Sequence, residues 1–116
     1  MTLRPWEVHL AHLDPVEGHE QGGQRPVVVI SSDFHLRVTR QRLVTVVPLT
    51  SRYREGWVHH VPIGGLRLAS FAITEQMRSL ATSRIEQRVL TVLTDAEQDA
   101  MRQALTRMMC WTTSTR

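Results

Sequence analysis

The residues from Gly18 to Ile30 read Gly-His-Glu-Gln-Gly-Gly-Gln-Arg-Pro-Val-Val-Val-Ile, and they join two kinds of structure in one short run. The first half is rich in glycine and polar side chains, a composition typical of a loop. The second half is β-branched, which favours a short buried strand. We therefore expect a polar loop over residues 16–24 that leads into an apolar strand over residues 26–30, with Arg25 at the junction.

Further short runs along the chain have the composition and alternation of strands. They cover residues 7–13, 42–49, 57–63 and 66–73, with residues 74–79 continuing or closing the same sheet. The turn expected between two of these runs is the pair Gly64–Gly65. The pattern of residues 85–93 does not clearly indicate a strand or a helix. Short strands separated by turns favour a mainly antiparallel β-fold.

The C-terminal region has the clearest local signal, and it is helical. Thr94–Glu97 has the form of a capping box. Apolar residues then recur at helical spacing, namely Ala100, Met101, Ala104, Leu105 and Met108. We expect a helix over about residues 95–109 with its methionine-rich face in the core. The pair Cys110–Trp111 is expected to pack, and the tail 112–116 to fray.

Length and composition limit the classes of function. A chain of 116 residues, 41% hydrophobic and 22% charged, suits one globular domain over residues 1–116, with a core modest enough to favour a partner subunit. The apolar runs are too short for a membrane span and the N-terminus lacks an apolar signal region, which predicts a cytoplasmic protein. With a single cysteine, and with His59–His60 pointing to opposite faces of a strand, we expect no metal site and no cofactor.

The fixed positive charge is carried entirely by arginine. The chain has 14 basic and 11 acidic residues, a net charge of +3, and no lysine. Guanidinium groups suit phosphate, but codon bias in a GC-rich genome is the simpler explanation. One basic cluster has no acidic residue between its members, which are Arg37, Arg40, Arg42, Arg52 and Arg54. Such a cluster either binds along a phosphate backbone or is a solvated face. Tyr53 and Trp57 either stack on unpaired bases or, for Trp57, pack in the core or a dimer interface.

Four motifs occur in register along most of the chain, roughly over residues 7–105. They are Gly-x-Glu-Gln-Gly-Gly-x-Arg-Pro ending at Pro26, Ile-Ser-Ser-Asp ending at Asp33, Val-Pro-Leu-Thr-Ser ending at Ser51, and Glu-Gln-Met-Arg-Ser-Leu ending at Leu80 before Arg84. In this order they resemble the MazF/PemK family of toxin endoribonucleases. The resemblance implies a small SH3-like, CcdB/PemK-type antiparallel β-barrel with a C-terminal α-helix, usually as a homodimer.

The same resemblance implies an activity and partners. Family members cut single-stranded RNA, mRNA among it, at short sequences without a metal ion. Attack by the 2′-hydroxyl leaves a 2′,3′-cyclic phosphate and a 5′-hydroxyl. Each is the toxin of a type II toxin–antitoxin system and is neutralised by a cognate antitoxin, here one similar to MazE or PemI. A disordered acidic antitoxin segment would compete with RNA for an arginine-lined groove.

Functional residues of the family carry over onto matching positions of this chain. Arg25 and Thr50 match the catalytic arginine and threonine. Glu20 and Gln21 match the acidic and amide residues of the RNA-facing loop. Two further matches near the active face are Ser51 and Gln76.

The side-chain chemistry is consistent with this set. A guanidinium presents several donors to the anionic phosphorane, so Arg25 is expected to act as an electrostatic clamp. The Thr50 hydroxyl is expected to hold the scissile phosphate or the attacking 2′-hydroxyl. Glu20 either serves as general base or orients Arg25. An unperturbed histidine has a pKa of about 6.5, so His19 is expected either to transfer a proton, to contact RNA, or to be a solvated loop residue.

Two alternatives use the same fold without nuclease chemistry. One is a CcdB-like toxin that poisons gyrase by protein–protein contact, and the other is a degenerate paralogue that only binds antitoxin. The Arg25 and Thr50 matches favour the nuclease. Departures from the family pattern occur at His9, where an aromatic is frequent, and at His35, in or near the RNA-contacting loop. The cleavage sequence therefore cannot be inferred from a relative.

Overall fold

The computed structural model describes residues 2–13, 23–53, 56 and 60–111. Its strands are β1 (Glu7–His12), β2 (Gln24–Val29), β3 (Leu43–Thr50), β4 (His60–Ile63), β5 (Ser70–Ile73), β6 (Arg78–Ala81) and β7 (Thr91–Val92). Its helices are α1 (Asp33–Val38), α2 (Asp95–Met108) and the 3₁₀ turns η1 (Thr74–Gln76) and η2 (Thr82–Arg84). The mainly antiparallel sheet with a C-terminal helix confirms the fold class expected from the sequence. No helix in these ranges is both long and apolar enough to cross a membrane.

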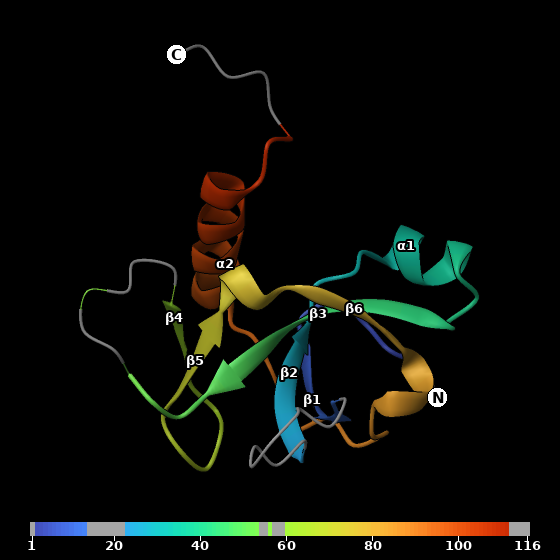
Figure 1. Cartoon of the computed structure of the whole chain (residues 1–116), viewed down its shortest axis with the longest axis horizontal. Coiled ribbons are helices and arrows are strands. Elements are labelled where there is room, and N and C mark those ends of the chain that lie inside the picture. The colour runs from blue at the N-terminus through green and yellow to red at the C-terminus, as the bar shows by residue number, and fades with distance from the viewer. Residues whose placement is uncertain (1, 14–22, 54–55, 57–59, 112–116) are drawn as a thin grey trace, which may run out of the picture.

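Strand β3 lies at the centre of the sheet and joins its two halves. The strands lie in the order β4-β5-β3-β2-β1-β7, and β6 also pairs with β3. One edge of β3 pairs with β2, for example Val47 with Val28. Its other edge pairs first with β6 and then, at Leu49 and Thr50, with β5. The sheet therefore curls about β3, which Figure 1 shows passing from β6 towards β5.

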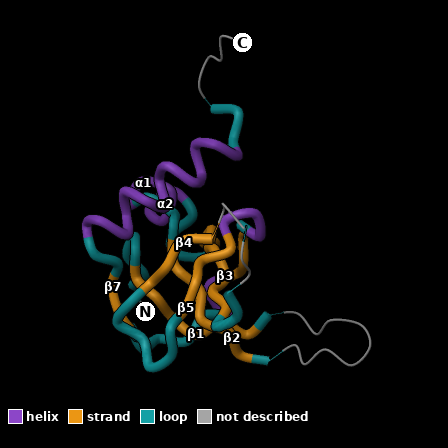
Figure 2. The backbone as a smooth tube through the Cα atoms, turned by 90° about the vertical axis from the view of Figure 1, so that its left-hand side faces the viewer, coloured by secondary structure: helices purple, strands orange, loops and turns teal. Residues whose placement is uncertain are grey.

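Successive side chains of a strand point to opposite faces of the sheet, and both faces of this sheet are covered and buried. On one face Val28 and Val47 pack with Met101 of α2, in a cluster that includes β4 and β5. On the other face Val27 and Val46 pack with side chains that include those of α1 and β6. Figure 2 shows α2 running along the outside of the strands. The fully buried Met101 confirms the expectation that the methionine-rich helix face is core.

Several sequence predictions need correction. The strand expected over 66–73 begins only at Ser70, because Gly65 takes a φ of +79° and the following residues bend. Residues 74–79, expected to continue or close the sheet, do so only in part: η1 covers the first three, and β6, which begins at Arg78, pairs with β3. The short helix α1 was not expected; Ser32 caps it by accepting the His35 N–H at 3.0 Å. The pair Cys110–Trp111 is exposed, so its expected packing is wrong.

The start of α2 carries the predicted capping box. Thr94 Oγ1 accepts the Glu97 N–H at 3.2 Å, and Glu97 Oε1 accepts the Thr94 N–H at 2.8 Å. Helix α2 spans Asp95–Met108, close to the expected 95–109. The tail 112–116 lies outside the described residues.

We expect Thr94→Ala to lower the free energy of unfolding by about 1 kcal/mol, because one N–H at the helix start loses its acceptor. Urea unfolding followed by circular dichroism measures this, and the slope of free energy against urea should not change. Thr106→Ala, at an exposed position inside the same helix, is the matched control and should not destabilise. Equal stability of the Thr94 variant and the parent would show that the cap contributes nothing.

Candidate functional site

Arg25 lies in β2, next to the polar loop predicted from the sequence. It pairs with Ala11 of β1, and its side chain is exposed. A guanidinium in this place is available to a ligand in solution. The neighbouring Pro26 is half-buried and the strand is buried from Val27 onward, so the cation sits where β2 emerges from the core.

Thr50 is the last residue of β3 and is half-buried. It pairs with Phe71 of β5, and its Oγ1 accepts the Arg52 N–H at 3.1 Å. A hydroxyl that accepts through a lone pair still carries its own hydrogen. Thr50 therefore combines a fixed position with a proton that it can donate to a ligand.

The β2–β3 register relates Arg25 to Thr50. The last pair of this ladder is Val27 with Pro48. Arg25 and Thr50 each stand two residues beyond that pair, and residues two apart in a strand share a face of the sheet. The ladder therefore directs a cation and a hydroxyl to the same face and the same end of the sheet, where β3 leaves β2 for β5 (Figure 1).

An aromatic pair extends this end of the sheet. The Tyr53 ring lies 5.2 Å from the Phe71 ring, centroid to centroid, and Tyr53 is 60% exposed. The exposed Tyr53 ring thus packs against the side chain of the β5 residue that pairs with Thr50. A ring in such a place can stack on an unpaired base.

The other residues predicted from the sequence do not all lie near Arg25 and Thr50. Ser51 directly follows Thr50 and is exposed. Gln76 is exposed in η1, between two strands that pair with the edge of β3 opposite to β2, so β3 separates it from Arg25. The loop candidates His19, Glu20 and Gln21 lie outside the described residues.

The described arginines of the basic cluster are divided between the two ends of β3. Arg42 precedes β3 and Arg52 follows it. Eight residues of strand separate the two by roughly 25 Å. Arg54 and Trp57 lie outside the described residues. His35, expected in or near the RNA-contacting loop, lies in helix α1, where its Nδ1 is 2.7 Å from Ser31 Oγ.

Histidine and carboxylate groups do not gather into a metal site in the part of the chain that is described. His59 is outside this part. The His60 side chain is 2% exposed, and its Nε2 lies 3.7 Å from Glu75 Oε1.

A pocket of about 510 Å³ opens at the other end of β2, next to Ile30. Its lining includes Trp6, Trp111 and Arg102, whose guanidinium carbon lies 5.3 Å from the Trp6 ring centroid. Trp111, which the sequence suggested as a packing residue, is thus an exposed wall of this pocket. Because β2 separates the pocket from Arg25, the two belong to different regions of the surface.

Sequence reasoning missed three residues at the end of β2 that carries Arg25. Glu86 Oε2 accepts a hydrogen bond from Gln24 Nε2 at 2.6 Å and lies 2.9 Å from His12 Nε2. We call His12, Gln24 and Glu86 the strand-end cluster. Glu86 falls in the stretch 85–93, where periodicity gave no clear signal. Its contacts are with residues more than sixty positions away, which no local pattern reports.

Comparisons with known proteins place this chain in a family. The sequence family of "PemK-like, MazF-like toxin of type II toxin-antitoxin system" matches residues 4–109. The chain is 37% identical over 91 residues to endoribonuclease MazF9 of Mycobacterium tuberculosis, covering 72% of this chain and 76% of that protein. It is 33% identical over 108 residues to endoribonuclease MazF of Staphylococcus saprophyticus, covering 89% and 88% respectively.

A solved structure agrees with the sequence matches. The MazF in a MazE–MazF crystal structure from Deinococcus radiodurans superposes with a TM-score of 0.75 at 26% identity, covering 95% of this chain and 97% of that one. Fold, motif order and sequence matches thus agree over nearly the whole chain. The chain belongs to the PemK-like, MazF-like toxin family of type II toxin–antitoxin systems.

Proposed function

We propose that this chain is an endoribonuclease toxin that cleaves single-stranded RNA at short sequences. The observation that carries the proposal is the shared end of β2 and β3, where the register brings an exposed Arg25 and the Thr50 hydroxyl to one face. The relatives with the highest sequence identity quoted above bear the name endoribonuclease. The exposed Tyr53 ring, packed against Phe71 of the strand that pairs with Thr50, supports a base-stacking contact.

The proposed reaction is a transesterification at phosphorus. The 2′-oxygen loses its proton to a general base and forms a bond to phosphorus, and the bond to the 5′-oxygen breaks. The 5′-oxygen takes a proton and leaves as a hydroxyl, and the 2′,3′-cyclic phosphate remains. Arg25 stabilises the negative charge of the phosphorane, and Thr50 donates its hydrogen to a phosphate oxygen. Glu20 is the candidate base, with His19, Gln21, Ser51 and Gln76 in contact with RNA.

We further propose a cytoplasmic homodimer neutralised by a cognate antitoxin. The Deinococcus relative is a MazF bound to MazE. Exposed apolar side chains, among them Phe34 and Val38 of α1 and Met109 and Trp111 after α2, offer surface to partner chains. Antitoxin with an acidic segment would bind the arginine-bearing end of the sheet and exclude RNA from it.

The test is cleavage of a long unstructured RNA by the purified chain in excess EDTA, with every fragment end mapped. We expect cuts at one repeated short motif, a 5′-hydroxyl on each downstream fragment and a 2′,3′-cyclic phosphate on each upstream one. EDTA should not slow the reaction, because the proposed chemistry uses side chains alone. A folded protein that leaves the RNA intact, or cuts only after Mg²⁺ is restored, would overturn the proposal.

A further inference from the structure

Glu86 connects the segment after η2 to the first strand through its backbone. Its N–H donates to the Leu10 carbonyl at 2.8 Å. Its carbonyl accepts from His9 Nδ1 at 2.7 Å. Next to it, Ile85 forms an isolated bridge with Ala11, the β1 residue that pairs with Arg25 on β2. The backbone of Glu86 is therefore fixed against the strand that borders Arg25.

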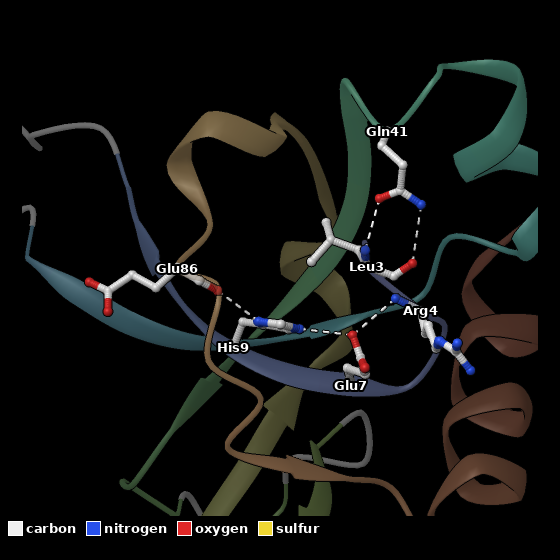
Figure 3. A network of polar contacts seen from close by, with 6 residues as sticks. All are labelled: Leu3, Arg4, Glu7, His9, Gln41 and Glu86. Atoms are coloured by element: carbon white, nitrogen blue, oxygen red, sulfur yellow. Dashed lines mark hydrogen bonds and ion pairs between the residues drawn. The ribbon is translucent and has the colours of Figure 1, made fainter. Parts of the chain in front are cut away.

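The histidine that holds Glu86 is itself fixed. His9 is 1% exposed, and its Nε2 lies 2.9 Å from Glu7 Oε1. The same Glu7 oxygen accepts the Arg4 N–H at 3.0 Å. Figure 3 shows this row, with the His9 ring between the Glu7 carboxylate and the Glu86 carbonyl. Buried polar groups with partners on both sides have little freedom to move.

The carboxylate of Glu86 points away from His9 (Figure 3) and completes the strand-end cluster. One oxygen, Oε2, bonds to Gln24 of β2 and to His12 of β1. His12 and Gln24 are opposite each other in the last pair of the β1–β2 ladder. Arg84 adds a contact from Nη1 to the His12 carbonyl at 3.5 Å. A segment distant in sequence thus ties the two strand ends together.

Gln24 is the immediate neighbour of Arg25, but the two side chains leave the strand on opposite faces. Glu86 is therefore suited to act on Arg25 through the backbone of β2 and not by direct contact. The His12–Glu86 pair is exposed on both partners, at 55% and 37%, so its net effect on stability should be small. Its effect on the placement of a neighbouring side chain is a separate matter, since small misplacements slow catalysis strongly.

We infer that Glu86 is a positioning residue for the proposed RNA cleavage. It fixes Gln24 against His12 and so sets the position of the β2 end that carries Arg25. The inference rests on the proposed function, in which Arg25 contacts the scissile phosphate.

The first test is Glu86→Ala, with a short single-stranded RNA that contains the motif mapped for the parent protein. We expect kcat to fall about tenfold with KM within about twofold, because Arg25 is displaced while the RNA surface is intact. Glu86→Gln should recover most of the rate, since its amide oxygen can accept from both Gln24 and His12. Asp99→Ala is the matched control: it removes an exposed carboxylate and its ion pair with Arg102, and should keep parent kinetics.

The route through Gln24 is tested by a double-mutant cycle. If Glu86 acts through Gln24, the double variant Glu86→Ala with Gln24→Ala loses no more rate than the worse single variant. A double variant that instead loses rate by the product of the two single-variant losses would overturn the inference. So would a raised KM at constant kcat, since that result assigns Glu86 to RNA binding, and so would a Gln variant as slow as the Ala variant.

A readout without RNA separates this inference from the proposed function. In ¹H–¹⁵N spectra, Glu86→Ala should shift the backbone amide signals of Gln24 and Arg25, and Asp99→Ala should leave them in place. If the parent cuts no RNA but these signals shift, the proposed function fails and the structural link stands. If both signals stay in place, the link from Glu86 to Arg25 is wrong.

Discussion

Arg25→Ala is expected to slow RNA cleavage by about 10³-fold, the largest effect of any single substitution proposed for this chain. The guanidinium is exposed beside the Thr50 end of β3 and is the group expected to face the charge that develops on phosphorus. Alanine removes every donor from that position. Arg25→Lys should recover only part of the rate, because an ammonium keeps the charge but lacks the planar fork.

The measurement is the single-turnover rate on a short RNA that contains the mapped motif. Arg107→Ala is the control, since it removes another exposed arginine, from the last turn of α2. Both variants should keep the thermal midpoint of the parent within about 2 °C, as exposed substitutions usually do. Cleavage by Arg25→Ala at the parent rate would contradict its assigned role. Toxicity retained without cleavage would favour the gyrase-directed alternative.

Met101→Ala is expected to lower the free energy of unfolding by about 3 kcal/mol. Met101 is fully buried and belongs, with Ala104 and Leu105 of the same helix, to the core cluster that contains Val28 and Val47 at the centre of the sheet. Its removal leaves a cavity where β2, β3 and the helix meet. For a chain of this length the thermal midpoint should fall by roughly 10 °C.

Met109→Ala is the matched control for this prediction. The same atoms are removed, but Met109 ends the helix and is 37% exposed. Its effect should be within about 0.5 kcal/mol, as at other surface positions. Calorimetry of the two variants measures the difference directly. Equal midpoints for the two would mean that the core closes around the lost side chain.

Local patterns were sufficient for the parts of the fold that depend on neighbours in sequence. The β-branched run before Ile30 and the capping box of α2 each fix their structure within a few residues. Helix α2 lies close to its expected range, whereas β2 covers Gln24–Val29 and not the expected 26–30, so Gln24 and Arg25 belong to the strand. Helix α1 was missed because it is only six residues long and buries a single side chain, Leu36. Periodicity cannot mark such a helix; only its Ser32 cap offered a signal.

In the candidate site, too, some residues could be found from the sequence and others only from the fold. Arg25 and Thr50 were predicted by resemblance, and the register of β2 and β3 then relates them in space. Glu86 could not be found in this way, because its partners His12 and Gln24 are 74 and 62 residues distant. Gln76 matched a motif position, yet β3 separates it from Arg25. Whether residues distant in sequence lie together depends on how the strands pair, and strand pairing cannot be inferred from a single sequence.

The carboxylate of Glu97 has a consequence for motion within the fold. One oxygen receives the Thr94 N–H of the helix cap, and the other receives the N–H of Gly64, in the turn that leads from β4 to β5, at 2.6 Å. Unwinding of the first helical turn therefore also frees a hairpin amide. Transient opening at these two places is one event, and the protons of Gly64 and Thr94 should exchange with solvent at matched rates. A single side chain thus joins helix and hairpin into one cooperative unit.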